Sequence, residues 1–493
     1  MNYQILLPAL AGCLVAFCAV NWIYFRILKI ALHKKLVDNP DARKLQKMPI
    51  PVLGGIAVYF GLLVGVLSGV VVYNWVTVPV YTSFVAVICA MSIMLYVGAL
   101  DDILGLTPSA RIVTEVLAVL ALVFSSGMCI DTFHGMWGVD SYSWLIAVPL
   151  TVFAAVGIIN AINMVDGVNG LSSGLCMCYC LFFGIYFIKV GHVANTVLAF
   201  CMIGALLPFF IHNVFGLKSR MFVGDSGTMT MGILMTWFLI NALSSKSAVI
   251  SFNNGGGVNM IALALAILSV PVFDTLRVMT MRMLKGRSPF SPDKTHLHHV
   301  FVNVGMSHFI TAMSEILIDV LIVAVWLVGA LCGLSMEWQL YLVILSSVTL
   351  VWGTYGILRF HVRRHTEFLF RLTKFSIRTH LGRTVWWKRI TEWLDAPGDY
   401  DENDDSRPVR DRTKLDIHID GIDIATERGA ARKCILEYLK GKAEVHLEDI
   451  IANSGADEVH VYPVIAEETR EGYVEVLNED PSGLPLSVAL VEE

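Results

Sequence analysis

The sequence predicts an all-α polytopic membrane protein of about 11 transmembrane helices, followed by a small C-terminal α/β cytoplasmic domain. Hydrophobic residues make up 56% of the 493 residues and charged residues 16%, whereas soluble domains are about 45–50% apolar and about 25% charged. Residues 1–391 carry 26 Lys/Arg and 15 Asp/Glu, and residues 392–493 carry 10 and 26. A basic membrane part therefore precedes an acidic tail. This composition excludes a disordered chain, a basic nucleic-acid binder and a small disulfide scaffold.

Apolar stretches long enough to cross a bilayer recur along the first 360 residues. They lie at residues 5–28, 52–73, 79–99, 111–127, 143–160, 172–189, 194–213, 227–244, 258–281, 310–332 and 338–358. The stretch at 111–127 is short and contains Glu115, which makes it the least typical of these spans.

Lys and Arg in the connecting loops predict the orientation of the spans. One side collects six Lys/Arg between residues 29 and 51, together with Arg111, the loops at 218–220 and 282–294, and the basic stretch after the last span. The opposite side receives only Lys189 and Lys246. We therefore expect the basic side to face the cytoplasm, with the N-terminus outside and the C-terminus inside.

The chain after the last span divides into three parts. Residues 359–389 hold nine Lys/Arg against one acid, Glu367, interleaved with aromatic residues, which predicts an amphipathic segment on the anionic inner leaflet. The expected organisation is a transmembrane domain at 1–360, a basic juxtamembrane segment at 361–391, an acidic linker at 392–412 and the α/β domain at 413–493. In this last domain we expect strands at 414–420, 457–463 and 472–477 and a helix at 425–441.

Four polar clusters fall at the cytoplasmic ends of the expected helices. They are Asp101-Asp102, residues 160–171, residues 224–227, and residues 288–299. Taken singly, each cluster has another interpretation. Asp101-Asp102 suits a helix end, and residues 160–171 suit a turn. Residues 224–227 suit an N-cap formed by Asp225 or Ser226, and residues 288–299 suit a solvated loop or a transition-metal site. However, Asn160, Asn163 and Asp166 are spaced three apart and project from one side of a helical turn.

Together the clusters provide the groups needed for phosphoryl-type transfer on a diphosphate at a membrane surface. Oxygen ligands for Mg²⁺ are available from Asp101, Asp102, Asn163, Asp166 and Asp225. Glycines let backbone N–H groups approach phosphate, and Arg111 with protonated histidines could hold phosphate oxygens.

At these residues the chain resembles the polyprenyl-phosphate N-acetylhexosamine-1-phosphate transferase family, of the glycosyltransferase family 4 type. The resemblance covers about residues 1–360 and is greatest to the bacterial undecaprenyl-phosphate N-acetylglucosamine-1-phosphate transferases. The matching pieces are Asp101-Asp102, residues 160–171, residues 222–227, residues 288–299 and a first loop with Asp38, Arg43 and Lys44. Ser-Pro-Phe at 288–290 with Asp293 and the histidines favours this branch over the related phospho-N-acetylmuramoyl-pentapeptide transferases, which remain the alternative.

The resemblance implies that a polyprenyl phosphate attacks the β-phosphorus of a UDP-N-acetylhexosamine, releasing UMP, with Mg²⁺ as cofactor and Mn²⁺ as a substitute. It implies metal ligands at Asn163 and Asp225, and a Lys or Arg on phosphate at the position of Arg111. It places Asp101, Asp102, Asp166, His296, His298 and His299 in the catalytic machinery, and Asn160, Gly167, Asn169, Arg43 and Lys44 at the substrates. The sequence departs from many relatives at Asn169, where they have Asp, and from some at Gln46, where they have His.

The expected location is the bacterial inner membrane, with membrane lipids as neighbours, a homodimer as one assembly and no nucleic-acid partner. Asp274 and Arg277 are spaced i, i+3 and suit either a structural ion pair or a substrate role. A transporter and a non-catalytic scaffold are rival classes. A transporter places ionisable groups near the midplane, whereas these clusters lie at helix ends.

Overall fold

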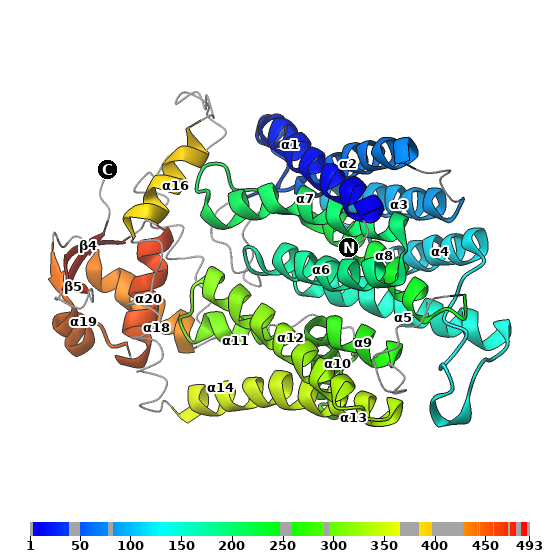
Figure 1. The fold of residues 1–493 in the computed structure, drawn as a ribbon. Helices are drawn as coiled ribbons and strands as arrows, with labels where there is room; N and C mark the ends of the chain where they lie inside the picture. Colours follow the sequence, from blue (N-terminus) through cyan, green and yellow to red (C-terminus); the bar gives the residue numbers. More distant parts are fainter. Residues whose placement is uncertain are drawn as a thin grey trace. The chain divides into compact units, whose positions relative to one another are not determined.

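The computed structural model describes most of the chain, and helices dominate it (Figure 1). It describes residues 3–38, 50–76, 82–246, 259–289, 295–364, 384–396, 427–440, 442, 444–456, 458–471, 474–479 and 485–490. The chain forms two compact units, which are described separately. The first comprises Met1–Asp38, Ile50–Ser291 and Ala312–Gly353, and the second comprises Asn39–Pro49, Pro292–Thr311 and Thr354–Glu493.

Within the described residues, ten helical segments are long and apolar enough to cross a membrane, and a bent pair would make eleven. Nine are single helices: α1 (Tyr3–His33), α2 (Gly54–Val76), α3 (Thr82–Leu104), α4 (Pro108–Ser126), α5 (Trp144–Met164), α6 (Leu171–Val190), α7 (Val193–Phe215), α8 (Gly224–Leu243) and α12 (His308–Leu331). The tenth runs through α13 (Met336–Ser347), η2 (Val348–Trp352) and α14 (Gly353–Arg364). The chain is therefore a multi-pass membrane protein, as the sequence predicts.

The span expected at 258–281 is present as two helices separated by a break. It consists of α9 (Met260–Ile267) and α10 (Ser269–Leu284), which meet at Leu268 with a bend of 78°. Pro271 has no N–H to donate, and its ring clashes with the carbonyl four residues earlier, so it opposes a continuous helix here. The carboxylate of Asp319 in α12 accepts hydrogen bonds from Ser269 Oγ at 2.9 Å and from the backbone N–H of Val270 at 3.3 Å. It therefore satisfies donors that the break exposes.

The short stretch with Glu115 does form a helix, α4. Thr107 precedes it and accepts a hydrogen bond from the N–H of Ala110 at 3.3 Å, and Pro108 occupies the first turn. Glu115 is completely buried, so its charge does not face lipid.

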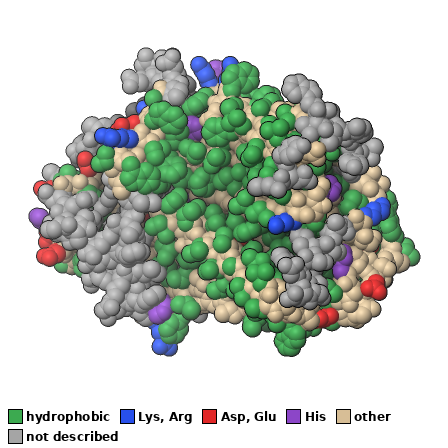
Figure 2. All heavy atoms as spheres, viewed as in Figure 1, with side chains coloured by type: hydrophobic (Ala, Val, Ile, Leu, Met, Phe, Trp, Pro, Cys, Tyr) green, Lys and Arg blue, Asp and Glu red, His purple; other side chains and the backbone are tan. Residues whose placement is uncertain are grey.

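Helix α8 lies at the centre of the first unit and is buried along its whole apolar length. Its N-terminal turn packs tightly against two neighbours, because a Cβ at Gly98 of α3 would meet Ser226 Cα at 2.5 Å and a Cβ at Gly55 of α2 would collide with Gly227. The periphery is apolar: Leu145 and Phe153 of α5 are 88% and 79% exposed. Figure 2 shows hydrophobic side chains over much of one face, as lipid contact requires.

Shorter elements connect the spans of the first unit. Strands β1 (Val37–Asp38) and β2 (Ile50–Pro51) pair antiparallel, and η1 (Met136–Gly138) lies between α4 and α5.

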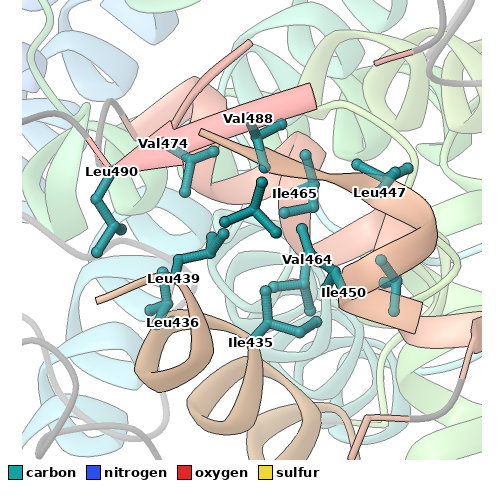
Figure 3. Close-up of a cluster of buried hydrophobic side chains, with 12 residues drawn as sticks. Ile435, Leu436, Leu439, Leu447, Ile450, Val464, Ile465, Val474, Val488 and Leu490 are labelled. Atoms are coloured by element: carbon teal, nitrogen blue, oxygen red, sulfur yellow. The ribbon is translucent and has the colours of Figure 1, made fainter. Parts of the chain in front are cut away.

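The second unit contains the small α/β domain. The unit also includes helices α11 (Leu297–Asn303) and α16 (Val385–Asp395). The α/β domain itself consists of α18 (Glu427–Leu439), β3 (Val445–His446), α19 (Leu447–Asn453), α20 (Glu458–Glu471), β4 (Val474–Glu479) and β5 (Pro485–Leu490). The antiparallel sheet has the order β3-β5-β4. Figure 3 shows the apolar side chains of α18, α19 and α20 gathered against this sheet.

Two expectations for this domain are confirmed and one is wrong. The helix expected at 425–441 is α18, and the strand expected at 472–477 is β4. Where a strand was expected at 457–463, residues 458–463 belong to helix α20 instead. Its buried residues Val461, Val464, Ile465 and Glu468 follow a helical spacing of three and four, which the short alternation at its start conceals. The strand expected at 414–420 lies outside the described residues.

Candidate active site

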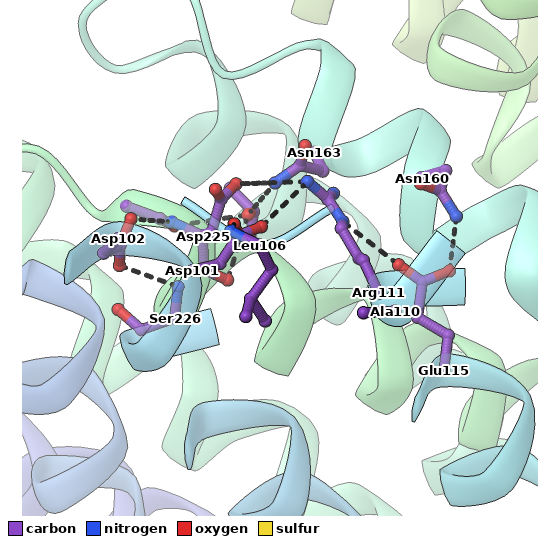
Figure 4. Close-up of polar contacts among 12 residues, drawn as sticks. Asp101, Asp102, Leu106, Ala110, Arg111, Glu115, Asn160, Asn163, Asp225 and Ser226 are labelled. Atoms are coloured by element: carbon purple, nitrogen blue, oxygen red, sulfur yellow. Dashed lines mark hydrogen bonds and ion pairs between the residues drawn. The ribbon is translucent and has the colours of Figure 1, made fainter. Parts of the chain in front are cut away.

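Asp102, in the last turn of α3, holds the beginning of α8. Its carboxylate accepts hydrogen bonds from the backbone N–H groups of Asp225 at 2.7 Å and Ser226 at 3.1 Å (Figure 4). The first N–H groups of a helix have no partner inside the helix, and Val223 before α8 provides no side-chain cap. The cap that the sequence suggested for Asp225 or Ser226 is thus supplied by Asp102 from another helix.

Gly224 makes this approach possible. Its φ of +71° favours glycine, and a Cβ there would meet Asp102 Oδ2 at 2.5 Å.

Asn163 of α5 meets Asp225 across the site. Its amide nitrogen is hydrogen-bonded to Asp225 Oδ1 and donates to Thr228 Oγ1 at 2.7 Å. The contact joins residues 62 positions apart. The structure therefore brings together the ends of α3, α5 and α8, with Asp102, Asn163 and Asp225 in one cluster.

Arg111 links two carboxylates of this cluster. Its Nη1 lies 3.5 Å from Asp101 Oδ2 and 3.7 Å from Asp225 Oδ1. Asp101 also accepts the backbone N–H of Leu106 at 2.7 Å, which shapes the turn from α3 to α4. The Asp225 side chain is 32% exposed against 9% for Asp101. Asp225 is therefore the more accessible of the two to a ligand.

Glu115 belongs to the site, although from the sequence it was considered only as an acidic residue that makes the span at 111–127 atypical. Its Oε1 accepts from Arg111 Nε at 3.3 Å, and its Oε2 accepts from the amide nitrogen of Asn160 at 2.5 Å. Figure 4 shows Glu115 between these two side chains. Two signals could have identified it: it follows Arg111 by four residues, on the same helix face, and an acid within a span is a functional candidate.

The turn between α5 and α6 carries Asp166, Gly167, Asn169 and Gly170. The Ser172 hydroxyl donates to Asp166 Oδ1 at 2.5 Å, and the N–H of Gly170, whose φ is +78°, donates to Asn213 Oδ1 at 2.6 Å. Gly167 is exposed and Asn169 is half-buried. Burial above all raises the pKa of Asp166 to about 7; the Ser172 hydrogen bond lowers it, and the nearby carboxylates of Asp225 and Asp102 contribute to the rise.

Asn213 of α7 is a second residue that the sequence reasoning missed. Besides accepting from Gly170, it donates from its amide nitrogen to the Met221 carbonyl at 2.8 Å. It therefore joins the turn after α5 to the segment that leads into α8.

The donor set fits a hard divalent cation. Arg111 forms ion pairs with Asp101, Glu115 and Asp225, and Asp102 and Asp166 lie near Asp225, so carboxyl groups outnumber the one guanidinium in this cluster of described residues. Within that part of the chain no three His, Cys, Asp or Glu side chains form a complete metal-binding group. A pair such as Asn163 and Asp225 nevertheless suits Mg²⁺, which typically takes one or two carboxylates and fills its shell with substrate phosphates and water. Because the amide of Asn163 can be turned, its carbonyl oxygen can replace its nitrogen beside Asp225.

The three histidines lie at the start of α11 in the second unit. The rings of His296 and His298 stack at 5.7 Å, and those of His298 and His299 are 4.4 Å apart. His296 and His298 are buried. Arg43 and Lys44 lie outside the described residues.

Asp274 and Arg277 form a buried ion pair, with Nη2 2.7 Å from Oδ1. This arrangement agrees with the structural alternative for these two residues.

Comparison with known proteins finds relatives across the helical part of the chain. Residues 84–243, which include Asp101, Arg111, Asn163 and Asp225, match the sequence model of glycosyl transferase family 4. The undecaprenyl-phosphate alpha-N-acetylglucosaminyl 1-phosphate transferase of Salmonella typhi is 32% identical over 310 residues, which cover 61% of this chain and 78% of the relative. The protein of the same name from Escherichia coli (strain K12) is 30% identical over 298 residues, covering 59% and 76%. That of Yersinia pestis is 29% identical over 331 residues, covering 66% and 85%.

Proposed function

The chain belongs to glycosyl transferase family 4, and from this premise we propose that it transfers N-acetylglucosamine 1-phosphate, or a related N-acetylhexosamine 1-phosphate, from a UDP-sugar to undecaprenyl phosphate. The names of its relatives support this acceptor and this sugar. The observation that carries the proposal is the meeting of Asp102, Asn163 and Asp225 at the ends of three spans. There a lipid phosphate held in the membrane can reach a water-soluble nucleotide sugar.

The reaction exchanges one phosphorus–oxygen bond for another. An oxygen of the lipid phosphate attacks the β-phosphorus of the UDP-sugar, and the bond from that phosphorus to the oxygen bridging to UMP breaks. UMP leaves with the electron pair, and a lipid-linked diphospho-sugar forms. Repulsion between two phosphate anions is the main barrier, so charge neutralisation is the chief demand on the site.

Asn163 and Asp225 would hold Mg²⁺ in this proposal, because the Asn163 amide lies against the Asp225 carboxylate at the accessible edge of the cluster and, once turned, offers its carbonyl oxygen there. When bound, Mg²⁺ supplies positive charge to the diphosphate. Arg111 supplies a fixed positive charge beside it, and Glu115 orients the guanidinium from the opposite side.

Asp101 and Asp102 serve mainly as positioning residues. Both oxygens of Asp102 accept backbone N–H groups, and Asp101 is held by Leu106 and Arg111. A phosphate monoester has a second pKa of about 6, so the acceptor is already mostly a dianion near pH 7. Removing its last proton there gains only on the order of 0.1 kcal/mol, which leaves little for a general base to contribute.

The exposed turn with Gly167 and Asn169 would contact the uridine, and Asp166 and Asn160 would support the surrounding structure. His296, His298 and His299 would act at the sugar or the diphosphate. The distribution of Lys and Arg supports a site at the cytoplasmic face of a bacterial inner membrane.

The test is an assay of the purified full-length protein in detergent with UDP-N-acetylglucosamine, undecaprenyl phosphate and Mg²⁺. We expect UMP release and a lipid-linked product that depend on both substrates. Because a detergent sample has no compartments, a transporter would give neither. A folded, monodisperse sample that releases no UMP with any member of a panel of UDP-N-acetylhexosamines would contradict the proposal.

A further inference from the structure

Helix α16 has two apolar faces rather than one. Thr391 and Leu394 on one face are buried. The opposite face carries Val385, Trp386 and Trp393, which are 67%, 47% and 72% exposed. Helical geometry places Arg389 among these three residues, whereas Lys388 and Glu392 fall on a polar flank. A helix at an ordinary protein–water boundary exposes its polar face, so this cluster of large exposed apolar side chains requires another explanation.

The packing of α16 relates it to the end of a membrane span. The ring of Trp387 contacts the ring of Phe309 edge to face, with centroids 5.7 Å apart. Phe309 is the second residue of α12, which is one of the ten candidate spans. Helix α16 therefore packs against the first turn of this candidate span, and the ends of spans are where tryptophan concentrates in membrane proteins.

The charge of the region favours an anionic lipid surface. Lys388 and Arg389 are exposed, and residues 359–389 contain nine Lys/Arg against one acid. Anionic lipids attract such segments, and tryptophans on the same helix enter the headgroup layer.

We propose that the outer face of α16, formed by Val385, Trp386, Arg389 and Trp393, rests on the anionic surface of the membrane. Trp386 and Trp393 lie among the headgroups, and Arg389 contacts lipid phosphate. The helix thereby anchors the start of the C-terminal part of the chain to the bilayer. This proposal does not depend on the proposed enzymatic function.

The test uses the full-length protein in vesicles of phosphatidylethanolamine and phosphatidylglycerol. The photo-crosslinking amino acid p-benzoylphenylalanine replaces Trp393 in one sample and Glu392 in the matched control, since Glu392 is exposed on the polar flank of the same helix. After illumination, mass spectrometry measures phospholipid adducts. We expect several-fold more adducts at position 393 than at 392. Equal yields, or adducts at 393 with protein only, would overturn the proposal.

A second variant tests the role of charge. In the sample labelled at position 393, Arg389→Gln is expected to reduce the enrichment of phosphatidylglycerol over phosphatidylethanolamine among the adducts by several-fold, while the total lipid yield stays unchanged. An unchanged enrichment in this variant would exclude Arg389 as the anionic-lipid contact. An unchanged elution profile in size-exclusion chromatography shows that each variant is folded.

Discussion

Asp102 accepts a hydrogen bond from the backbone N–H of Asp225 at 2.7 Å, so one acidic residue of the site holds the backbone that carries another. The contact joins the last turn of α3 to the first turn of α8 and sets where the Asp225 carboxylate lies. It explains why an adjacent pair of aspartates can have different roles: Asp102 faces the helix terminus, and Asp101 faces Arg111. The roles of both in turnover are open to direct tests.

The first prediction concerns Asp102. Asp102→Asn keeps one oxygen acceptor but presents an amide group to the second backbone N–H, so the start of α8 is held less firmly. We expect turnover to fall by about tenfold at every pH, since a lost cap costs roughly 1 kcal/mol and misplaces Asp225. The measurement is a pH–rate profile of Asp101→Asn and Asp102→Asn. Recovery toward wild-type activity above about pH 8 would instead indicate a general base.

The second prediction concerns the metal. Asp225→Ala is expected to abolish Mg²⁺-dependent UMP release while the protein still inserts and purifies normally, and Asn163→Ala is expected to raise the Mg²⁺ concentration needed for half-maximal activity. Chelation of divalent ions should abolish UMP release by the wild-type protein, and added Mn²⁺ should restore this activity. Near-normal activity of Asp225→Ala in detergent would remove this residue from the metal site.

The third prediction concerns Glu115 as a positioning residue for Arg111. Glu115→Gln keeps the size of the side chain but weakens its charge-assisted hydrogen bond to the guanidinium, so we expect kcat/KM to fall by about tenfold. The KM for the UDP-sugar should change more than kcat, because Arg111 would be poorly oriented toward phosphate.

A double-mutant cycle checks this mechanism. In an Arg111→Gln background, Glu115→Gln should have little further effect, because the group that it orients is gone. Effects that simply add would mean that Glu115 acts independently of Arg111.

The fourth prediction concerns the break between α9 and α10. Asp319 is buried and accepts from Ser269 and Val270, so Asp319→Ala leaves buried donors without a partner, at a cost of about 1–3 kcal/mol. Asp319→Asn keeps an acceptor and should lose much less stability. Thermal unfolding in detergent compares the two variants. Equal midpoints would show that Asp319 does not stabilise the bend.

The fifth prediction concerns pH and stability. The pKa of Asp166 is raised to about 7 in the folded protein, so the folded state binds this proton more tightly than the unfolded chain, where aspartate has a pKa of about 3.9. The stability that this tighter proton binding contributes is fully present below about pH 4 and is lost as the pH rises through about 7. We expect Asp166→Asn to flatten this decline in unfolding midpoint, measured without divalent ions. An unchanged slope would contradict the assignment.

The sequence by itself determined the membrane class, the approximate spans and the polar clusters at their ends, because span length and apolar composition are local properties of the chain. It did not reveal that Glu115 faces Arg111 and Asn160, that Asp102 caps a distant helix, or that Asp319 supports a bend. These are contacts between helices, and a buried polar side chain takes its role from whichever partner the packing brings within hydrogen-bonding distance. Residues 457–463 show the same limit, because a short alternating stretch suits a strand until burial of Val461, Val464 and Ile465 against the neighbouring elements selects a helix.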